Sequence, residues 1–402
     1  MHNGETPPSA DRENYFQKYL QYASFLLSSY KGREPFHLYL KKYFSRHRKH
    51  GSKDRKMITA LCYNYFRLGA GVIGEGDPEQ SFLLAVYLCE NVYSPLLAFF
   101  KPEWSASIDA LLPQKISTVR GQFDGEHIFP FNDELSGQIN IQGFNNSFLL
   151  QPKVFIRVRP GYQAQVTAQL KDASIVFDQL PQGCIAVKNN QKIDTVVELD
   201  TQAVVQDYNS QRTLDFLRPI FDAGGSEKSV WDACAGSGGK SILAFDQFRN
   251  VLLTVTDIRK NILENLKKRF EKAGLSKYHL AVADLEKTSG SVPGDFEVII
   301  ADVPCSGSGT WSRTPEQLRF FKRGDIKKYA TLQRRIVGNA VRSLKDKGYL
   351  LYITCSVFRK ENEENIAFFQ QALPLKLLQA DYLKGYDLQA DTLFAALFVS
   401  QK

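Results

Sequence analysis

The sequence predicts an α/β protein in which a doubly wound parallel sheet follows a small α+β domain and an all-helical N-terminal domain. Two observations lead to this fold class. From about residue 229 onward, short apolar runs alternate with amphipathic helix patterns, as they do in strand–helix–strand units. Before residue 101, apolar side chains recur at helical spacing, and a mixed segment lies between these two regions. We expect three domains, at residues 1–130, 131–221 and 222–402.

The N-terminal domain is expected to be helical from Asn14 to about Lys101. One apolar stripe at helix spacing comprises Ile58, Leu61, Cys62, Tyr65 and Phe66. Residues 115–150 contain more Gly, Asn and Pro, which is typical of a connector. We therefore expect this domain to end in irregular chain.

The middle domain combines both kinds of pattern. Residues 162–170 carry a helix pattern. Its expected strands are residues 154–158, 175–177 and 195–199. The C-terminal domain begins with the first of five further expected strands, which are residues 230–233, 252–256, 279–283, 298–301 and 349–353. Helix patterns at residues 258–273 and 325–344 lie between them, and this alternation predicts the parallel sheet.

The charge of the chain indicates a polyanionic partner. The formal net charge is +8, and basic residues concentrate between Lys41 and Lys56. An RNA-binding role is predicted for Lys41, Arg46, Arg48, Lys49, Lys53 and Arg55. His47 and His50 would add titratable positive charge there. The alternative is that the cluster is only a solvated helix face.

Composition excludes several classes of protein. The six cysteines have neither the spacing of a disulfide framework nor that of a zinc site, so we expect no metal. The polar N-terminus has no apolar core of a signal peptide, and no apolar run approaches a membrane span. We expect a cytoplasmic protein, independent of membranes, that acts as a monomer.

A glycine-rich loop follows the first strand of the parallel sheet and opens a helix. Its candidate cofactor-binding residues are Cys234, Ala235, Gly236, Ser237, Gly238, Gly239 and Lys240. Glycines allow a ligand to approach the backbone closely, and a helix N-terminus supplies hydrogen-bond donors. The Gly-Lys-Ser ending is not a phosphate-binding P-loop, because Gly236 lies only three residues before Gly239.

Aspartates end the next three strands. Asp257, Asp284 and Asp302 each follow an apolar run, and an acidic side chain at such a strand end can accept hydrogen bonds from a ribose diol. A single strand-end aspartate is commonly a cap or a turn former. Three in one sheet favour an adenosine-bearing cofactor, either S-adenosylmethionine or a dinucleotide.

Two cysteines also follow strands of this sheet. Cys305 lies in Asp302-Val-Pro-Cys-Ser-Gly307, and Cys355 lies in Tyr352-Ile-Thr-Cys-Ser356. Ligands of open α/β sheets bind at the carboxyl ends of the strands, so the two thiols could meet over one substrate. The alternative, that they are small core residues, fits the other four cysteines better.

Together, these motifs resemble those of the Sun-type RNA cytosine-C5 methyltransferases, which have a Rossmann-like sheet. The matching segments keep the family's order and are Asp232–Ser241, Asp257, Asp284, Asp302–Gly309 and Tyr352–Val357. The stretch from Gly51 to Arg67 is similar to the helical, NusB-like RNA-binding domain of bacterial small-subunit ribosomal RNA methyltransferases. The loop departs from the family pattern at Gly236, Ser237 and Ser241, where Ala, Pro and Thr are usual.

The resemblance implies transfer of a methyl group from S-adenosylmethionine to C5 of a cytosine in RNA, first of all 16S ribosomal RNA. It assigns the nucleophile to Cys355, release of the adduct to Cys305 and the cytosine amino edge to Asp302. Lys240 would supply positive potential near the thiol. Arg157, in an arginine-containing strand, and Arg313, after the Pro-Cys motif, become candidate RNA contacts, and Trp311 could stack on a base.

Several alternatives stay open at this point. DNA-type enzymes use the Pro-Cys thiol itself as nucleophile, and the presence of both cysteine motifs favours RNA. Transfer RNA is the second candidate substrate. A dinucleotide-dependent oxidoreductase would have no evident use for two strand-end cysteines. A non-catalytic RNA-binding or ribosome-assembly protein would not need Lys240, Asp302 and both thiols.

Overall fold

The structure is a computed structural model that describes residues 9–74, 77–222, 227–248, 250–287, 292 and 294–402. Its described residues form two compact units. The first unit contains the chain up to Asp133, together with Asn140–Gln151 and Trp311–Phe321. The second contains Glu134–Ile139, Pro152–Thr310 and Lys322–Lys402. The three-domain division stays a prediction, but residues 152–221 share a unit with the parallel sheet.

The first unit is helical, as the apolar spacing predicted. Its helices are α1 (Ser9–Ser29), α2 (Phe36–Arg46), α3 (Ser52–Arg67), α4 (Pro78–Cys89), α5 (Pro95–Phe100), α6 (Pro102–Ser105), α7 (Leu112–Thr118), α8 (Ile141–Phe148) and α14 (Gln317–Phe320). Ile58, Leu61 and Cys62 of α3 are fully buried. The predicted stripe is therefore the core-facing side of that helix.

The expected connector at residues 115–150 is partly wrong, because α7 and α8 lie in it. Its asparagines have specific partners that irregular chain would not need. Asn140 caps α8 by accepting a hydrogen bond from the Gly143 N–H at 2.7 Å. Asn145 is fully buried and accepts one from the Phe129 N–H at 2.6 Å. Caps and a buried side chain thus account for a composition that indicated a loop.

In the second unit, a four-stranded antiparallel sheet has the order β2-β3-β1-β4. Its strands are β1 (Val154–Val158), β2 (Phe177–Leu180), β3 (Cys184–Val187) and β4 (Ala203–Val205), and α9 (Gln163–Asp172) follows β1. The strand expected at residues 195–199 is wrong, since a 3₁₀ turn occupies Ile193–Thr195. Val197 is buried in the core of this sheet, and Val196 packs against that core. These β-branched residues therefore fill the core and do not form a strand.

The seven-stranded sheet has the order β10-β11-β9-β8-β5-β6-β7. Its parallel strands are β5 (Lys228–Asp232), β6 (Val251–Asp257), β7 (Tyr278–Val282), β8 (Phe296–Asp302) and β9 (Leu344–Thr354). All five were predicted. The strands β10 (Leu375–Leu383) and β11 (Leu393–Ser400) were not, and β11 pairs with β9 in antiparallel fashion.

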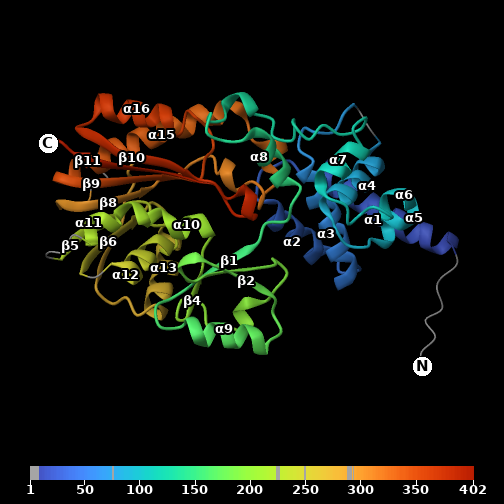
Figure 1. Ribbon diagram of the computed structural model, residues 1–402, viewed down its shortest axis with the longest axis horizontal. Coiled ribbons are helices and arrows are strands. Elements are labelled where there is room, and N and C mark those ends of the chain that lie inside the picture. The colour runs from blue at the N-terminus through green and yellow to red at the C-terminus, as the bar shows by residue number, and fades with distance from the viewer. Residues whose placement is uncertain (1–8, 75–76, 223–226, 249, 288–291, 293) are drawn as a thin grey trace. The chain divides into compact units, whose positions relative to one another are not determined.

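Helices cover both faces of this sheet (Figure 1). One face carries α12 (Gly239–Gln247) and α13 (Lys260–Lys272), and the other carries α15 (Arg323–Ala340) and α16 (Glu363–Ala372). The short helices α10 (Tyr208–Arg212) and α11 (Arg218–Asp222) precede β5. This is the predicted doubly wound, Rossmann-like arrangement. No helix of the described ranges is long and apolar enough to cross a membrane.

Candidate active site

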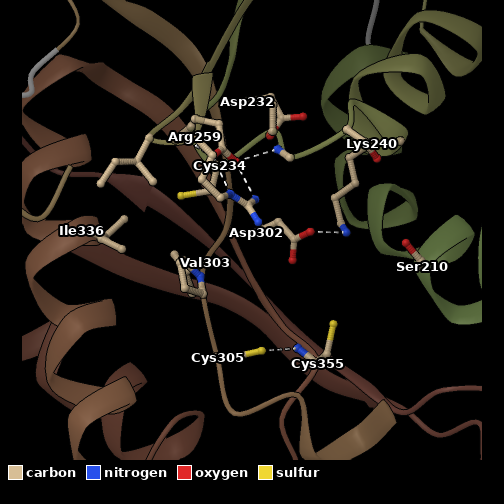
Figure 2. A pocket seen from close by; sticks show the side chains of 18 of the residues that line it. Ser210, Asp232, Cys234, Lys240, Arg259, Asp302, Val303, Cys305, Ile336 and Cys355 are labelled. Atoms are coloured by element: carbon tan, nitrogen blue, oxygen red, sulfur yellow. Dashed lines mark hydrogen bonds and ion pairs between the residues drawn. The ribbon is translucent and has the colours of Figure 1, made fainter. Parts of the chain in front are cut away.

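A cavity of about 640 Å³ lies at the carboxyl ends of the parallel strands. The segments that follow β5, β6, β7, β8 and β9 all line it, so each parallel strand of the sheet contributes. Parallel strands place their carboxyl ends at the same edge, and short turns there leave a crevice. The cavity thus lies at the edge of the sheet where a ligand was expected from the sequence. Figure 2 shows the side chains that point into it.

The glycine-rich loop after β5 requires its glycines for two different reasons. Gly236 and Gly238 have positive φ angles of 53° and 82°, which disfavour a side chain. At Gly238 an added Cβ would lie 2.5 Å from Cε1 of Phe270, so this residue faces the core. At Gly239 an added Cβ would meet nothing within 4 Å, and this residue lines the cavity. The loop therefore keeps bare backbone beside open space.

Most of the predicted cofactor residues border this one cavity. They are Cys234, Ala235, Gly236, Ser237, Gly239, Lys240, Asp257, Asp284 and Asp302. Gly238, the remaining one, packs against Phe270 and Leu266. The fold therefore brings all of the predicted cofactor residues except Gly238 to one cavity. Within the described part of the chain, no group of His, Cys, Asp and Glu could hold a metal ion.

Asp232, the last residue of β5, was missed as a site residue. Its carboxylate is buried beside the cavity and accepts a hydrogen bond from the Ser241 hydroxyl at 2.6 Å. The other carboxylate oxygen, Oδ1, has no donor among the described residues. Burial raises the pKa of Asp232 to about 7. Its signal in the sequence was its place as the acidic residue that opens the glycine-rich loop.

The Asp257 carboxylate is already occupied by hydrogen bonds. Its Oδ1 accepts from the Arg259 N–H and Nε, both at 2.9 Å, and its Oδ2 accepts from Arg259 Nη2 and the Gly236 N–H, both at 3.0 Å. Burial opposes ionisation, but these bonds outweigh it and hold the pKa of Asp257 below its usual value. A ribose hydroxyl would have to displace Arg259, which the sequence did not indicate.

Asp284 and Asp302 differ in their partners. Asp284 is half-buried and pairs with Lys287 at 3.0 Å. Asp302 pairs with the buried Lys240, whose Nζ lies 2.5 Å from Oδ2 (Figure 2). Burial disfavours the charge on Lys240, but Asp302 outweighs this effect and raises the pKa of the lysine. Lys240 therefore remains charged at neutral pH.

The two predicted thiols meet at the same cavity. The backbone N–H of Cys355 donates a hydrogen bond to Sγ of Cys305 at 3.3 Å, as Figure 2 shows. Both residues line the cavity and are partly exposed. The hydrogen bond with Cys305, burial and the charge of Asp302 raise the pKa of Cys355 well above its usual value, whereas Lys240 acts to lower it. The Cys355 thiol is thus protonated in this state.

A buried carboxylate fastens the two cysteine loops to each other. Glu361 is fully buried, and its Oε2 accepts from the Ser306 N–H at 3.0 Å and from Gln333 Nε2 at 2.7 Å. Its Oε1 accepts from the Ser356 hydroxyl at 2.6 Å. Ser306 follows Cys305 and Ser356 follows Cys355, so one side chain holds both loops. Glu361 was also missed by sequence reasoning.

The predicted RNA contacts have mixed outcomes. The six candidates between Lys41 and Arg55 lie in the second half of α2, in the turn after it and at the start of α3, in the first unit. All of them except the half-buried Arg55 are exposed. Arg313 is half-buried in the same unit. For these seven residues an RNA contact stays a prediction. His50, by contrast, is buried, and burial lowers its pKa, so it adds no charge at pH 7.

Arg157 and Trp311 are corrected by the structure. The Arg157 side chain is only 5% exposed and pairs with Asp246 at 2.5 Å, so it is not an RNA contact here. It joins the four-stranded sheet to α12 instead. Trp311 is 1% exposed and packs on Phe129 in the first unit, with ring centroids 5.5 Å apart. It is a core residue and cannot stack on a base.

Comparison with known proteins relates the domain that contains this cavity to RNA methyltransferases. Residues 222–392 match the family model described as 16S rRNA methyltransferase RsmB/F. The ribosomal RNA small subunit methyltransferase B of Xanthomonas campestris pv. campestris is 31% identical over 169 residues, which cover 42% of this chain and 38% of that protein. The probable methyltransferase B of Bacillus subtilis is 28% identical over 241 residues, 56% of this chain and 51% of that protein.

Two solved structures share the fold. PH0851 covers 99% of this chain and 100% of its own, with a TM-score of 0.67 and 19% identity. NSun6 from Pyrococcus horikoshii, solved with SFG, covers 66% of this chain and 96% of its own, with a TM-score of 0.56 and 15% identity. The match to the curated relatives spans about two-fifths to one half of their lengths. Residues 222–392 of this chain therefore form a methyltransferase-like domain that matches the RsmB/F family model.

Proposed function

We propose that this protein transfers a methyl group from S-adenosylmethionine to C5 of a cytosine in RNA, with 16S ribosomal RNA as the substrate. The observation that carries the proposal is the pair of thiols at one cavity, with the Cys355 N–H 3.3 Å from the Cys305 sulfur. The RsmB/F family match over residues 222–392 supports the choice of RNA.

The residues around the cavity fit a cationic adenosine derivative. The bare backbone at Gly239 leaves room for a ligand, and Asp232 has a carboxylate oxygen without a donor among the described residues. Asp284 and Asp302 are each paired with a lysine, but acidic side chains outnumber basic ones in the lining of the cavity. These carboxylates suit a ligand with a sulfonium and an ammonium group, whereas the diphosphate of a dinucleotide would be repelled. When bound, S-adenosylmethionine supplies an electrophilic methyl group.

Nucleophilic catalysis by Cys355 answers the chemical difficulty, which is that C5 of cytosine is a weak nucleophile. The Cys355 thiolate forms an Sγ–C6 bond, and the electron pair of the C5–C6 double bond becomes available at C5. C5 then takes the methyl group. Transfer of the C5 proton to a water molecule lets the C5–H electron pair restore the double bond, and the electron pair of the Sγ–C6 bond returns to sulfur, which frees the Cys355 thiolate. Covalent catalysis thus replaces one difficult step with several easier ones.

Neighbouring residues have supporting roles in this proposal. Asp302 accepts a hydrogen bond from the cytosine amino group, and Cys305 assists the release of the adduct. Lys240 favours the thiolate form of Cys355, in keeping with its effect on the pKa of that thiol. The target base must be unpaired or leave its stack to reach the cavity. The phosphates of the RNA would be attracted by the basic segment at residues 41–56.

The two cysteines can be separated by experiment. The protein is incubated with 16S ribosomal RNA and S-adenosylmethionine that carries a labelled methyl group. We expect Cys355→Ala to abolish transfer, because no adduct can form. We expect Cys305→Ala to accumulate protein bound covalently to RNA, because addition proceeds while release is blocked. Cys62→Ala, at a buried cysteine of α3, is the matched control and should transfer like the wild type.

Three results would contradict the proposal. Full activity of both cysteine variants would exclude covalent catalysis by these thiols. Binding of a nicotinamide dinucleotide in the cavity would favour an oxidoreductase. Binding of S-adenosylmethionine without transfer to any RNA would leave a non-catalytic assembly protein. Transfer to transfer RNA in place of 16S ribosomal RNA would correct the substrate alone.

A further inference from the structure

Three hollows follow one another along α15 in the second unit. The first is the cavity that holds the two thiols. The second, of about 500 Å³, shares Leu332 with the first, and the third, of about 460 Å³, shares Arg335 with the second. Glu286 borders all three. Because they share lining residues, the three hollows lie next to one another along α15, and together they are called the groove, which begins at the candidate active site.

The walls of the groove are basic. Lys327, Lys328 and Arg335 line the second hollow. Arg334, Arg335, Arg342 and Lys402 line the third. Between Lys322 and Lys347 the chain has nine Lys and Arg residues and only two Asp residues. This short stretch therefore holds a large part of the net positive charge of the molecule, which is +8.

Acidic neighbours cancel only part of this charge. Glu286 pairs with Arg335 at 3.1 Å, and Asp325 pairs with Lys328 at 2.6 Å. Arg334 instead donates to the neutral amide oxygen of Asn365 at 2.6 Å, and its guanidinium lies 4.7 Å from the Phe368 ring centre. Such contacts orient the cation and leave its charge in place. The groove thus offers fixed positive charges beside exposed lysines.

We propose that this groove, from Lys327 to Arg342, binds the phosphate backbone of the RNA strand next to the target nucleotide. The inference rests on the proposed function, because a strand whose base lies in the cavity must continue along an adjoining surface. The part of α15 from Lys327 to its end at Ala340 spans about 20 Å at 1.5 Å per residue, which is enough for several nucleotides. A polyanion is the partner that this charge fits.

A binding assay with charge-reversal variants tests the groove. The probe is a fluorescein-labelled, single-stranded oligocytidylate of 20 nucleotides, and its Kd is measured at several KCl concentrations. We expect the double variant Lys327→Glu/Lys328→Glu to weaken binding about tenfold or more and to reduce the salt slope by about 1.4, since two single-strand phosphate contacts are lost. The same assay on Lys327→Gln/Lys328→Gln should give a smaller loss.

The matched control carries the same charge change elsewhere in the same unit. Lys267→Glu/Lys268→Glu alters two exposed lysines of α13 that do not line the groove. We expect its Kd to stay within about twofold of the wild type, because only long-range electrostatics change. Equal losses in the two double variants, or no loss in either, would overturn the proposal.

The proposal for the groove and the proposed function can be refuted independently. Binding of the probe requires no methyl transfer, so loss of binding only in the Lys327/Lys328 variants supports the groove even if no RNA is methylated. If the wild type methylates RNA while the Lys327→Glu/Lys328→Glu variant binds and methylates equally well, the groove is refuted and the function stands. Calorimetry of S-adenosylmethionine binding to each variant verifies that the cavity is intact.

Discussion

At the scale of single residues, the Cys355 thiol lies between two charges of opposite sign. Asp302 and the hydrogen bond with Cys305 favour the protonated thiol, and Lys240 favours the thiolate. The net effect raises the pKa of Cys355 well above its usual value. The proton is therefore retained at neutral pH, and only the thiolate can add to C6. The site gains reactivity whenever this balance moves toward Lys240.

The first prediction concerns pH. Because the pKa of Cys355 is raised, the thiolate fraction should grow about tenfold per pH unit below that pKa. We expect the single-turnover rate of methyl transfer, at saturating cofactor and RNA, to rise from pH 7 to pH 9. Lys240→Met should lower the rate and move this rise to higher pH, whereas Lys267→Met on α13 should not. A rate that falls over this range would contradict the account.

Arg259 is the subject of a second prediction. Its side chain and backbone occupy three of the four hydrogen bonds to the Asp257 carboxylate. Arg259→Ala removes the two side-chain donors, so the carboxylate becomes free to accept from a ribose hydroxyl. We expect S-adenosylmethionine to bind about threefold to tenfold more tightly in calorimetry, as one hydrogen bond to a charged group would give. Weaker binding would mean that Arg259 positions Asp257 for the ligand.

The residues that sequence reasoning found and missed differ in a physical way. Cys305, Cys355 and Asp302 each follow an apolar strand, so local pattern and sheet topology sufficed to place them together. Arg259 bonds to Asp257 only two positions earlier, but the rotamer that brings them together is not visible in the sequence. Glu361 acts through side-chain contacts that are distant in sequence. Glu361 reaches Ser306, 55 positions earlier in the chain. Arg157 is the reverse case. A sequence motif suggested an RNA contact for Arg157, but its side chain is buried in the fold.

At the scale of elements, the loops after β8 and β9 must keep a fixed relation for the thiols to face one substrate. Glu361 gives both loops a common acceptor just before α16. Gln333, from α15, donates both to Glu361 and to the Pro304 carbonyl, the latter at 3.1 Å. Because these groups are buried, each depends on its partner.

A third prediction follows for Glu361. Glu361→Ala leaves buried donors of Ser306, Ser356 and Gln333 without an acceptor, each at a cost of about 1–3 kcal/mol. We expect a lower melting temperature and a large loss of kcat, with little change in the Kd of S-adenosylmethionine. Glu364→Ala, at a partly exposed glutamate of α16, is the control and should change neither. An unchanged kcat in folded Glu361→Ala would show that the loops hold their positions without it.

The elements that were predicted best were those whose sequence pattern follows directly from burial. The parallel strands β5, β6, β8 and β9 are largely buried in their carboxyl-terminal halves, so their apolar runs were visible in the sequence. The edge strand β10 was missed because most of its residues are exposed or half-buried and it depends on pairing with β11. β11 is almost wholly buried, and its apolar run, Leu393–Ser400, was overlooked. At residues 195–199, β-branched side chains pack in the core of the four-stranded sheet although the segment forms no strand.

At the scale of the whole molecule, a buried ion cluster joins the two sheets of the second unit. Asp246 of α12 is 4% exposed and pairs with Arg157 at 2.5 Å and with Arg159 at 2.8 Å. Both arginines come from or follow β1 of the four-stranded sheet. The negative charge of Asp246 offsets the loss of hydration of the two buried guanidinium groups.

The fourth prediction is that Asp246→Ala destabilises this unit strongly. Removing one partner leaves buried charges uncompensated, which costs about 3–5 kcal/mol. The free energy of unfolding in urea measures the loss. Asp178→Ala, which removes a surface pair with Lys153, should cost no more than about 1 kcal/mol. Equal costs for the two variants would mean that the buried cluster contributes no more than a surface pair.

The division into units also shows what chain order conceals. Trp311–Phe321 follows the Pro-Cys motif in sequence but belongs to the first unit. There, the Phe36 N–H donates to the Glu316 carboxylate at 3.2 Å, across 280 positions of the chain. Sequence patterns assign residues to domains by neighbourhood. A segment that leaves one unit for another is visible only when its contacts are known.

Peptide mapping of the trapped complex tests the central claim most directly. The Cys305→Ala protein is incubated with S-adenosylmethionine and 16S ribosomal RNA, digested with nuclease and protease, and examined by mass spectrometry. We predict a peptide with a methylated cytidine nucleotide attached at Cys355. Attachment at any other residue, or no attached nucleotide while the wild-type protein methylates the same RNA, would contradict covalent catalysis by this thiol.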